Sequence, residues 1–113
     1  MATTFEVLSE LNRRLILDLL LVQECPVGTL VEAMGVSQPS VSKHLRVLRR
    51  AGLVECRTDA QRRVYRVRTE PLRDVDEWLA PYRARWASHL DALEEHLDAI
   101  DPDPTRVDGA EGE

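Results

Sequence analysis

The basic side chains of this 113-residue chain are concentrated in one stretch, a distribution typical of proteins that bind a polyanion. Residues 38–68 hold nine Lys and Arg against only Glu55 and Asp59, which gives them a formal charge of +7. The rest of the chain carries −12, so the net charge is −5 although one region is strongly basic. This asymmetry indicates one polyanion-binding face on an acidic body. The alternative is that these arginines form an ordinary solvated surface.

The side chains that could read DNA share one face of a helix predicted from Ser37 to about Ala51. At about 100° per residue, Val41, Leu45 and Leu48 cluster on the inner side and anchor the helix. His44 falls at the border of that side, where a packing role is at least as good an interpretation as contact with a base. The predicted DNA-binding residues of this helix are Gln38, Pro39, Ser40, Ser42, Lys43, His44, Arg46 and Arg50.

The outward-facing side chains suit different parts of the DNA. Gln38 and Ser42 can hydrogen-bond to base edges in the major groove. Lys43 and Arg46 can reach guanine acceptors or phosphates. Ser40, together with the helix N-terminus, can bind a phosphate through its hydroxyl and backbone N–H groups.

The elements around this helix form a helix-turn-helix pattern. A short helix is expected over residues 27–34, and Gly35 suits the left-handed position that follows a helix end. Ser37 is a good N-cap for the next helix, and Pro39 is tolerated in its first turn. Gly52 ends that helix. Short helix, glycine turn and capped helix together favour a DNA-binding motif.

A β-hairpin is predicted directly after the motif. Residues 53–57 and 63–68 read as strands, and residues 58–62 read as a polar turn. Such a hairpin is a wing, and Arg62 and Arg63 near its tip are expected to contact phosphates or the minor groove. Contact with the DNA backbone and projection into solvent both stay open for three further arginines, Arg57, Arg66 and Arg68.

Helices are expected on both sides of this region, so the fold class is mainly α with a small β-hairpin. The apolar spacing predicts helices over residues 4–10 and 13–23, with Asn12 as the N-cap or junction between them. Pro26 ends the second of these helices because it disfavours helical geometry in the residue before it.

A long helical stretch, residues 71–100, follows the hairpin. Its apolar residues form a narrow stripe close to a heptad repeat, which requires a partner helix. Pro81 is expected to kink or break the helix near Leu79. We expect residues 1–100 to form one domain and the acidic, proline- and glycine-containing residues 101–113 to be disordered.

The ordered motifs resemble those of the ArsR/SmtB family of winged helix-turn-helix repressors. The matching stretches are residues 8–17 (LSELNRRLIL), 36–48 (VSQPSVSKHLRVL) and 51–54 (AGLV). The resemblance covers about residues 5–68, and it implies a homodimer joined by its first and last helices. It also implies a recognition helix near residues 38–50 and release from DNA when a signal changes the dimer. The dimerisation residues expected on this basis are Phe5, Leu8, Leu79, Tyr82, Trp86, Leu90, Leu93 and Leu97.

The chain departs from the resembled family at two places. Leu11 and Asn12 precede Arg13, where the family often has proline and threonine, so the shape of the first junction is open. Residues 29–34 contain no Cys or His, so the metal-binding cysteine cluster of some members is missing there. Polar residues of the last helix make only a borderline ligand set that does not match the family's spacing: His89, Asp91, Glu94, Glu95, His96 and Asp98. We therefore predict no metal site and no cofactor.

Other kinds of chemistry find less support in the sequence. Cys25 and Cys56 would form a redox switch only if brought together, and buried inert thiols are the better interpretation. An unidentified small-molecule effector could bind near the aromatic residues of the last helix. The chain has no phosphate-binding loop, nucleophile motif or convergent carboxylate pair, so it is not expected to be an enzyme.

The sequence therefore predicts a cytoplasmic, homodimeric repressor that binds double-stranded operator DNA and does not enter a membrane. A metal- or redox-responsive sensor repressor is the alternative within the same class of function. A helix-mediated protein-interaction module is the alternative from a different class. It would explain the stripe of the last helix but not the basic stretch.

Overall fold

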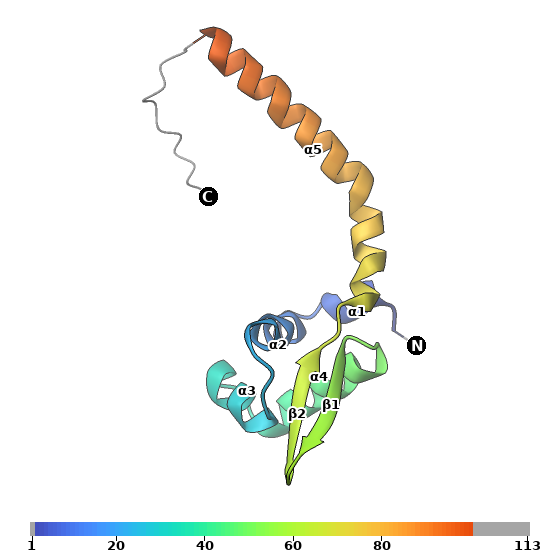
Figure 1. Cartoon of the computed structure of the whole chain (residues 1–113). Helices are drawn as coiled ribbons and strands as arrows, with labels where there is room; N and C mark the ends of the chain where they lie inside the picture. Colours follow the sequence, from blue (N-terminus) through green and yellow to red (C-terminus); the bar gives the residue numbers. More distant parts are fainter. Residues whose placement is uncertain (1, 101–113) are drawn as a thin grey trace. The chain divides into compact units, whose positions relative to one another are not determined.

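A computed structural model describes residues 2–100, with side chains to residue 98, and Figure 1 shows the order of its elements. The chain divides into two compact units, one ending at Glu77 and the other beginning at Trp78. The first unit contains four helices, a hairpin and a short 3-10 helix: α1 (Thr4–Leu8), α2 (Leu11–Val22), α3 (Val27–Met34), α4 (Gln38–Arg50), β1 (Val54–Asp59), β2 (Arg62–Val67) and η1 (Glu70–Leu72). Helix α5 (Arg73–Ile100) begins in the first unit and continues as the second. The predicted tail of residues 101–113 lies outside the described residues.

Polar side chains and arginines fix the junction between α1 and α2. Thr3 and Glu6 form a capping box, because the Glu6 N–H donates to Thr3 Oγ1 and the Thr3 N–H donates to the Glu6 carboxylate. The expectation that Asn12 caps α2 is wrong. The cap is Glu10, whose carboxylate accepts the Asn12 N–H at 2.8 Å, so the helix begins one residue before Asn12. Arg13 then donates to the Val7 carbonyl, which has no partner inside the short α1.

The turn between α3 and α4 follows from two residues. Gly35 ends α3 in the left-handed conformation, with φ of 68°, which glycine adopts without a Cβ penalty. Ser37 caps α4, since its Oγ accepts the Ser40 N–H at 3.3 Å. Both features match the sequence-based expectation, and together they set the direction in which α4 leaves the turn.

The hairpin is longer than the sequence indicated. β1 and β2 pair antiparallel from Val54 opposite Val67 to Asp59 opposite Arg62, so only residues 60–61 remain as the turn. Ala60 occupies that turn with φ of 60°, a left-handed conformation that is unusual for a residue with a Cβ. Figure 1 shows the turn end of the hairpin extending beyond α4.

The sheet separates the two cysteines. Tyr65 of β2 is paired with Cys56 on one side and, through an isolated bridge, with Cys25 on the other. Neighbouring strands lie about 5 Å apart, so the two cysteine Cα atoms are about 10 Å apart, whereas a disulfide requires less than about 7 Å. Both cysteines are free. An intramolecular disulfide switch therefore does not fit this fold, and burial raises the pKa of the Cys25 thiol.

One apolar core holds the first unit together. Its fully buried side chains come from five elements and the loop before β1: Val7, Ile16, Leu20, Leu30, Val41, Leu45, Leu48, Leu53 and Val54. Three of them belong to α4, so the inner face of that helix is fixed against the rest of the unit and its outer face is left free. Burial of apolar surface is the main stabilising contribution to such a fold.

Helix α5 contains Pro81 but is not broken by it. Of the predicted kink or break near Leu79, the break is wrong, because the helix runs without interruption from Arg73 to Ile100. A proline removes one backbone hydrogen bond, and the remaining bonds of a 28-residue helix carry the chain past it. Within the part of the chain that the structure describes, no helix is both long and apolar enough to cross a membrane.

Candidate nucleic-acid interface

Helix α4 presents a polar and basic face to solvent. Its period of 3.6 residues buries Val41, Leu45 and Leu48 and leaves the opposite side exposed. Five of the predicted DNA-binding residues are exposed there: Gln38, Pro39, Lys43, Arg46 and Arg50. Ser40 and Ser42, at the flanks, are half-buried. In chemical terms this face offers amide, hydroxyl, ammonium and guanidinium groups to a ligand with many acceptors.

His44 points to the other side of the helix. Its Nε2 lies 3.8 Å from Oε1 of Glu10, the cap of α2, and its side chain is only 13% exposed. Its Nδ1 is buried, with no hydrogen-bond partner among residues 2–98. We therefore expect His44 to hold α4 against α2 rather than to reach a base. The position of His44 at the border of the helical wheel is compatible with both packing and contact with a base.

The hairpin sorts its arginines by face, because successive side chains of a strand alternate. On one face Arg57 donates to Glu24 at 3.1 Å, and Arg66 and Arg68 both donate to Glu55. These pairs raise the pKa of Arg57 and lower the pKa of Glu55. The positive charges on this face are therefore largely compensated within the chain, which favours the structural role for the three arginines whose role the sequence left open.

The other face of the hairpin turns an arginine and a tyrosine toward α4. Arg63 and Tyr65 lie on this face with Cys56, which is the partner of Tyr65 across the strands. The neighbouring Cys56 raises the pKa of the Arg63 guanidinium. Arg62, the other predicted tip residue, is exposed and has the opposite orientation, where it borders a pocket between the hairpin and α3. The two neighbouring arginines therefore face different sides of the wing.

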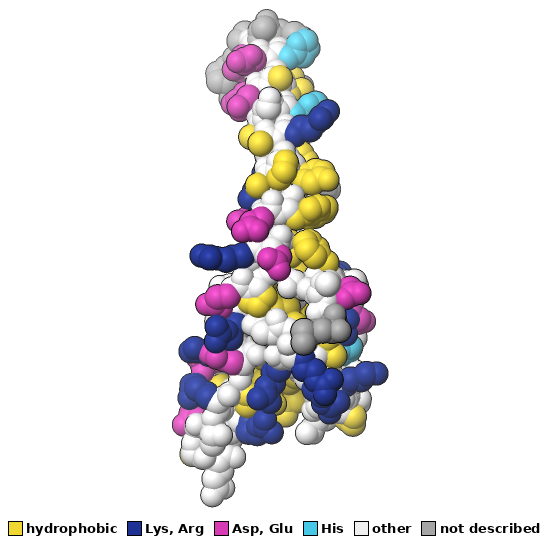
Figure 2. All heavy atoms as spheres, turned by 90° about the vertical axis from the view of Figure 1, so that its right-hand side faces the viewer, with side chains coloured by type: hydrophobic (Ala, Val, Ile, Leu, Met, Phe, Trp, Pro, Cys, Tyr) yellow, Lys and Arg dark blue, Asp and Glu magenta, His cyan; other side chains and the backbone are white. Residues whose placement is uncertain are grey.

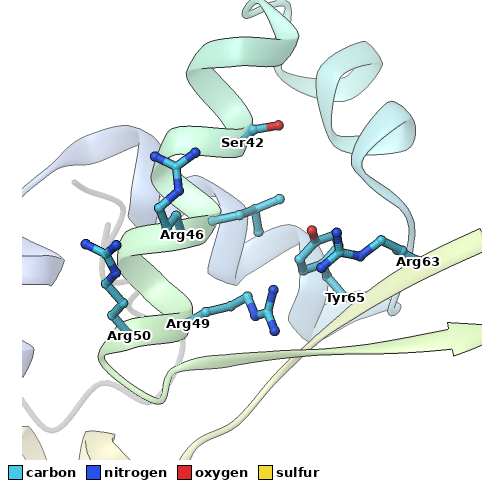
Figure 3. Close-up of a pocket in the computed structure, with 7 residues that line it drawn as sticks. Ser42, Arg46, Arg49, Arg50, Arg63 and Tyr65 are labelled. Atoms are coloured by element: carbon cyan, nitrogen blue, oxygen red, sulfur yellow. The ribbon is translucent and has the colours of Figure 1, made fainter.

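Between α4 and β2 lies an open pocket of about 490 Å³ that contains no acidic side chain. Its lining is Ser42, Leu45, Arg46, Arg49, Arg50, Arg63 and Tyr65. Figure 3 shows Arg49 extending from α4 toward Tyr65 and Arg63, whereas Arg46 and Arg50 extend to the other side of the helix. Figure 2 shows Lys and Arg side chains gathered around α4 and the hairpin.

Sequence reasoning counted Arg49 in the basic stretch but did not place it or Tyr65 at the interface. Arg49 lies at the edge of the helical wheel. The only available signal for Tyr65 was its alternation with Arg63, which puts both on one strand face. Alternation alone does not say which strand face is turned toward α4. The pocket is therefore a product of the tertiary packing.

The residues predicted at a dimer interface are mostly exposed within the single chain. In α1, Phe5 is exposed and Leu8 is half-buried. In α5, Val75 and Leu79 are half-buried, and six large apolar side chains are exposed: Trp78, Tyr82, Trp86, Leu90, Leu93 and Leu97. Figure 2 shows this row of hydrophobic side chains along α5. A row of this length on a water-exposed helix favours a partner that covers it.

No metal centre is formed within the described chain. Among residues 2–98, no three or more His, Cys, Asp and Glu side chains come close enough to hold an ion. His89 and His96 are both exposed on α5.

Known proteins match both the helix-turn-helix and the whole fold. The family described as bacterial regulatory protein, arsR family, matches residues 11–55. The transcriptional repressor SdpR of Bacillus subtilis (strain 168) is 33% identical over 79 residues, which are 70% of this chain and 88% of that protein. The nodulation protein NolR of Rhizobium meliloti is 48% identical over 50 residues, which are 44% of this chain and 41% of that protein. A solved structure described as a possible transcriptional regulator for arsenical resistance is 33% identical with a TM-score of 0.63, and the match covers 85% of this chain and 97% of that one.

Proposed function

Because this chain belongs to the ArsR family of DNA-binding transcription regulators, we propose that it is a homodimeric repressor that inserts α4 into the major groove of its operator. The observation that carries the proposal is the outer face of α4. Lys43, Arg46 and Arg50 lie there without an acidic partner among the described residues, while the inner face is fully buried. A rigidly held helix with uncompensated donors suits the acceptors of guanine and phosphate.

The residues divide into readers of bases and binders of the backbone. Gln38, Ser42 and Arg46 are placed to meet base edges, with Arg46 able to make a bidentate contact to guanine. Ser40, at the N-terminus of α4, supplies a hydroxyl next to the backbone N–H groups of the first turn, which favours a phosphate. Arg62 at the wing tip is exposed, and we assign it to the neighbouring groove.

A second copy of the chain is the proposed partner of the apolar row on α5. Two copies of the row, brought together on a two-fold axis, would cover each other's tryptophans and leucines. The same axis would set two α4 helices on successive major grooves, about 34–36 Å apart. The operator is therefore expected to contain two half-sites related by approximate inverted symmetry.

The test is fluorescence anisotropy on DNA from upstream of the chain's own gene, with excess competitor DNA. Saturable binding at two protomers per site is expected. Arg46→Ala should weaken operator binding about 5- to 150-fold, corresponding to the roughly 1–3 kcal/mol of a good bidentate contact, and should weaken competitor binding much less. Arg66→Ala, whose partner is Glu55, is the matched control. The proposal would be refuted if competitor DNA abolished all binding to the upstream DNA and a selection from random DNA also recovered no specific site.

A further inference from the structure

We propose that the pocket between the C-terminal half of α4 and β2 seats one backbone phosphate of the operator, held by Arg49 and Arg63 with the Tyr65 hydroxyl. The inference rests on the proposed function and adds a contact that it does not contain, since the outer face of α4 reads bases beside it. The phosphate would be the point at which the recognition helix and the wing hold the same strand of DNA.

The first support is the convergence of two positive charges. Arg49 comes from α4 and Arg63 from β2, and Figure 3 shows both directed toward the Tyr65 ring. Burial and the neighbouring Cys56 raise the pKa of the Tyr65 phenol, while the charges of Arg63 and Arg49 act in the opposite direction. Both guanidinium groups are therefore within electrostatic reach of the same hydroxyl. An anion between two like charges relieves their mutual repulsion.

The second support is that the chain does not supply that anion. The pocket is lined without any carboxylate. Over residues 2–98, neither Arg49 nor Arg63 has an ion pair, although three arginines on the opposite wing face each have one. The same hairpin thus pairs Arg57, Arg66 and Arg68 with carboxylates on one face, where among the described residues only Arg62 at the tip has no ion pair, and it leaves Arg63 uncompensated on the face beside the recognition helix. Such an arrangement indicates that the partner of Arg49 and Arg63 comes from outside the chain.

The third support is the fit of a phosphate. Guanidinium groups match phosphate oxygens in a two-pronged geometry, and a neutral tyrosine hydroxyl donates to a third oxygen. Arg63 and Tyr65 lie on the same strand face and both line the pocket, so the two groups are side by side before the anion arrives. The pocket is open, with a volume of about 490 Å³, so a phosphate that is part of a continuous strand can enter and leave by its sides. A base that is stacked inside the duplex cannot enter the pocket in this way.

The experiment compares the salt dependence of DNA binding between two double variants. Arg49→Ala with Arg63→Ala removes the proposed seat. Arg57→Ala with Arg66→Ala removes the same number of charges from the other wing face, where each arginine is paired with a carboxylate. One lost phosphate contact makes the slope of log K against log salt less negative by about 0.9. Between 50 and 200 mM salt, the affinity of the first variant should therefore fall by a factor about 3.5 times smaller than that of the wild type. The first variant should show this on operator and on unrelated DNA alike, and the control should keep the wild-type slope.

A second arm locates the phosphate. A set of operators carries one uncharged methylphosphonate linkage each, at successive positions along the strand. The wild type should lose affinity when the linkage stands at one particular position in each half-site. The Arg49→Ala, Arg63→Ala variant should lose no further affinity at that position. Circular dichroism establishes that both double variants fold, which is expected because the four side chains are exposed.

Two outcomes would overturn the inference. One is an unchanged salt slope in the Arg49→Ala, Arg63→Ala variant, with the wild type still binding its operator specifically; the proposed function would then survive without the seat. The other is a rise in melting temperature with inorganic phosphate that only the wild type shows, at phosphate concentrations that leave its DNA affinity unchanged at constant ionic strength. That result would assign the pocket to free phosphate instead of DNA. Failure of the wild type to bind any operator would instead refute the proposed function.

Discussion

Leu90 offers the sharpest test of the proposed dimer, because its side chain has the most to gain from a partner among the leucines of the α5 row. It is 61% exposed in the single chain. Complete burial of a leucine contributes about 1.5–3 kcal/mol, so covering the exposed part would contribute roughly 1–2 kcal/mol per chain. A symmetric dimer counts this contribution twice. Leu90→Ala should therefore weaken the dimer by about 2–4 kcal/mol and raise its dissociation constant about 25- to 700-fold.

Ser88→Ala is the matched control. Ser88 is also exposed, but it lies two residues earlier and thus about 200° around the helix from Leu90. Both variants introduce alanine, a strong helix former, so neither should reduce the helix content measured by circular dichroism. Sedimentation equilibrium over a range of protein concentrations then measures the dissociation constant. Operator affinity should fall with dimerisation for Leu90→Ala and stay at the wild-type value for Ser88→Ala.

A dimer of unchanged strength in Leu90→Ala, with normal helix content, would show that the α5 row is covered by something other than a second copy. Equal weakening by both variants would mean that the effect comes from the helix itself and not from the apolar face. Either result would remove the physical reason for placing two α4 helices on successive grooves.

Two further substitutions test the local conformations that position α4 and the wing. Gly35→Ala should destabilise the fold by roughly 0.5–1 kcal/mol, because the left-handed conformation costs alanine about 1–2 kcal/mol and the reduced freedom of the unfolded chain returns part of it; no atom lies within 4 Å of the added methyl, so the cost is one of backbone conformation. Gly28→Ala is equally open but lies in a helix, so it should stabilise the fold slightly. Urea unfolding at fixed protein concentration compares the midpoints of the two variants, and equal shifts in both midpoints would contradict the argument. Glu55→Gln should lower the melting temperature at pH 7, and the difference from the wild type should shrink as the pH falls: hydrogen bonds from Arg66 and Arg68 hold the pKa of Glu55 below its ordinary value, so its contribution is present above the unfolded-state pKa and is lost as the pH falls through the folded one. A difference that does not shrink with falling pH would mean that the carboxylate acts by something other than these pairs.

Much of the fold could be predicted because it depends on residues close together in sequence. The spacing of Val41, Leu45 and Leu48 fixes the buried side of α4, whatever the rest of the unit looks like. Gly35 and Ser37 specify where one helix ends and the next begins, through a backbone conformation and a side-chain cap. The basic stretch and the apolar row of α5 are equally visible in the sequence. Together these local features are enough to indicate the class of function.

The details that differ from expectation depend on other parts of the chain. Glu10 caps α2 although Asn12 is the better cap by residue type, because Arg13 and Arg14 tie the following turn to the carbonyls of α1. The hairpin extends to Asp59 and Arg62 because cross-strand pairing continues past the residues of low strand propensity. Pro81 stays inside a helix whose remaining hydrogen bonds outweigh the one that proline removes.

The division of the wing arginines shows where sequence reasoning ends. Alternation along one strand separates Arg63 and Tyr65 from Arg66, and it can be read from the sequence alone, whereas the face of Arg57 follows from the register between the strands. Only the packing of the hairpin decides that the first face meets α4, and only the folded chain brings Glu24 to Arg57 across 33 residues. Periodicity and capping are local and therefore visible in the sequence. The compensation of one charge and the exposure of another are set by contacts between distant segments, so they become defined only when the tertiary structure forms.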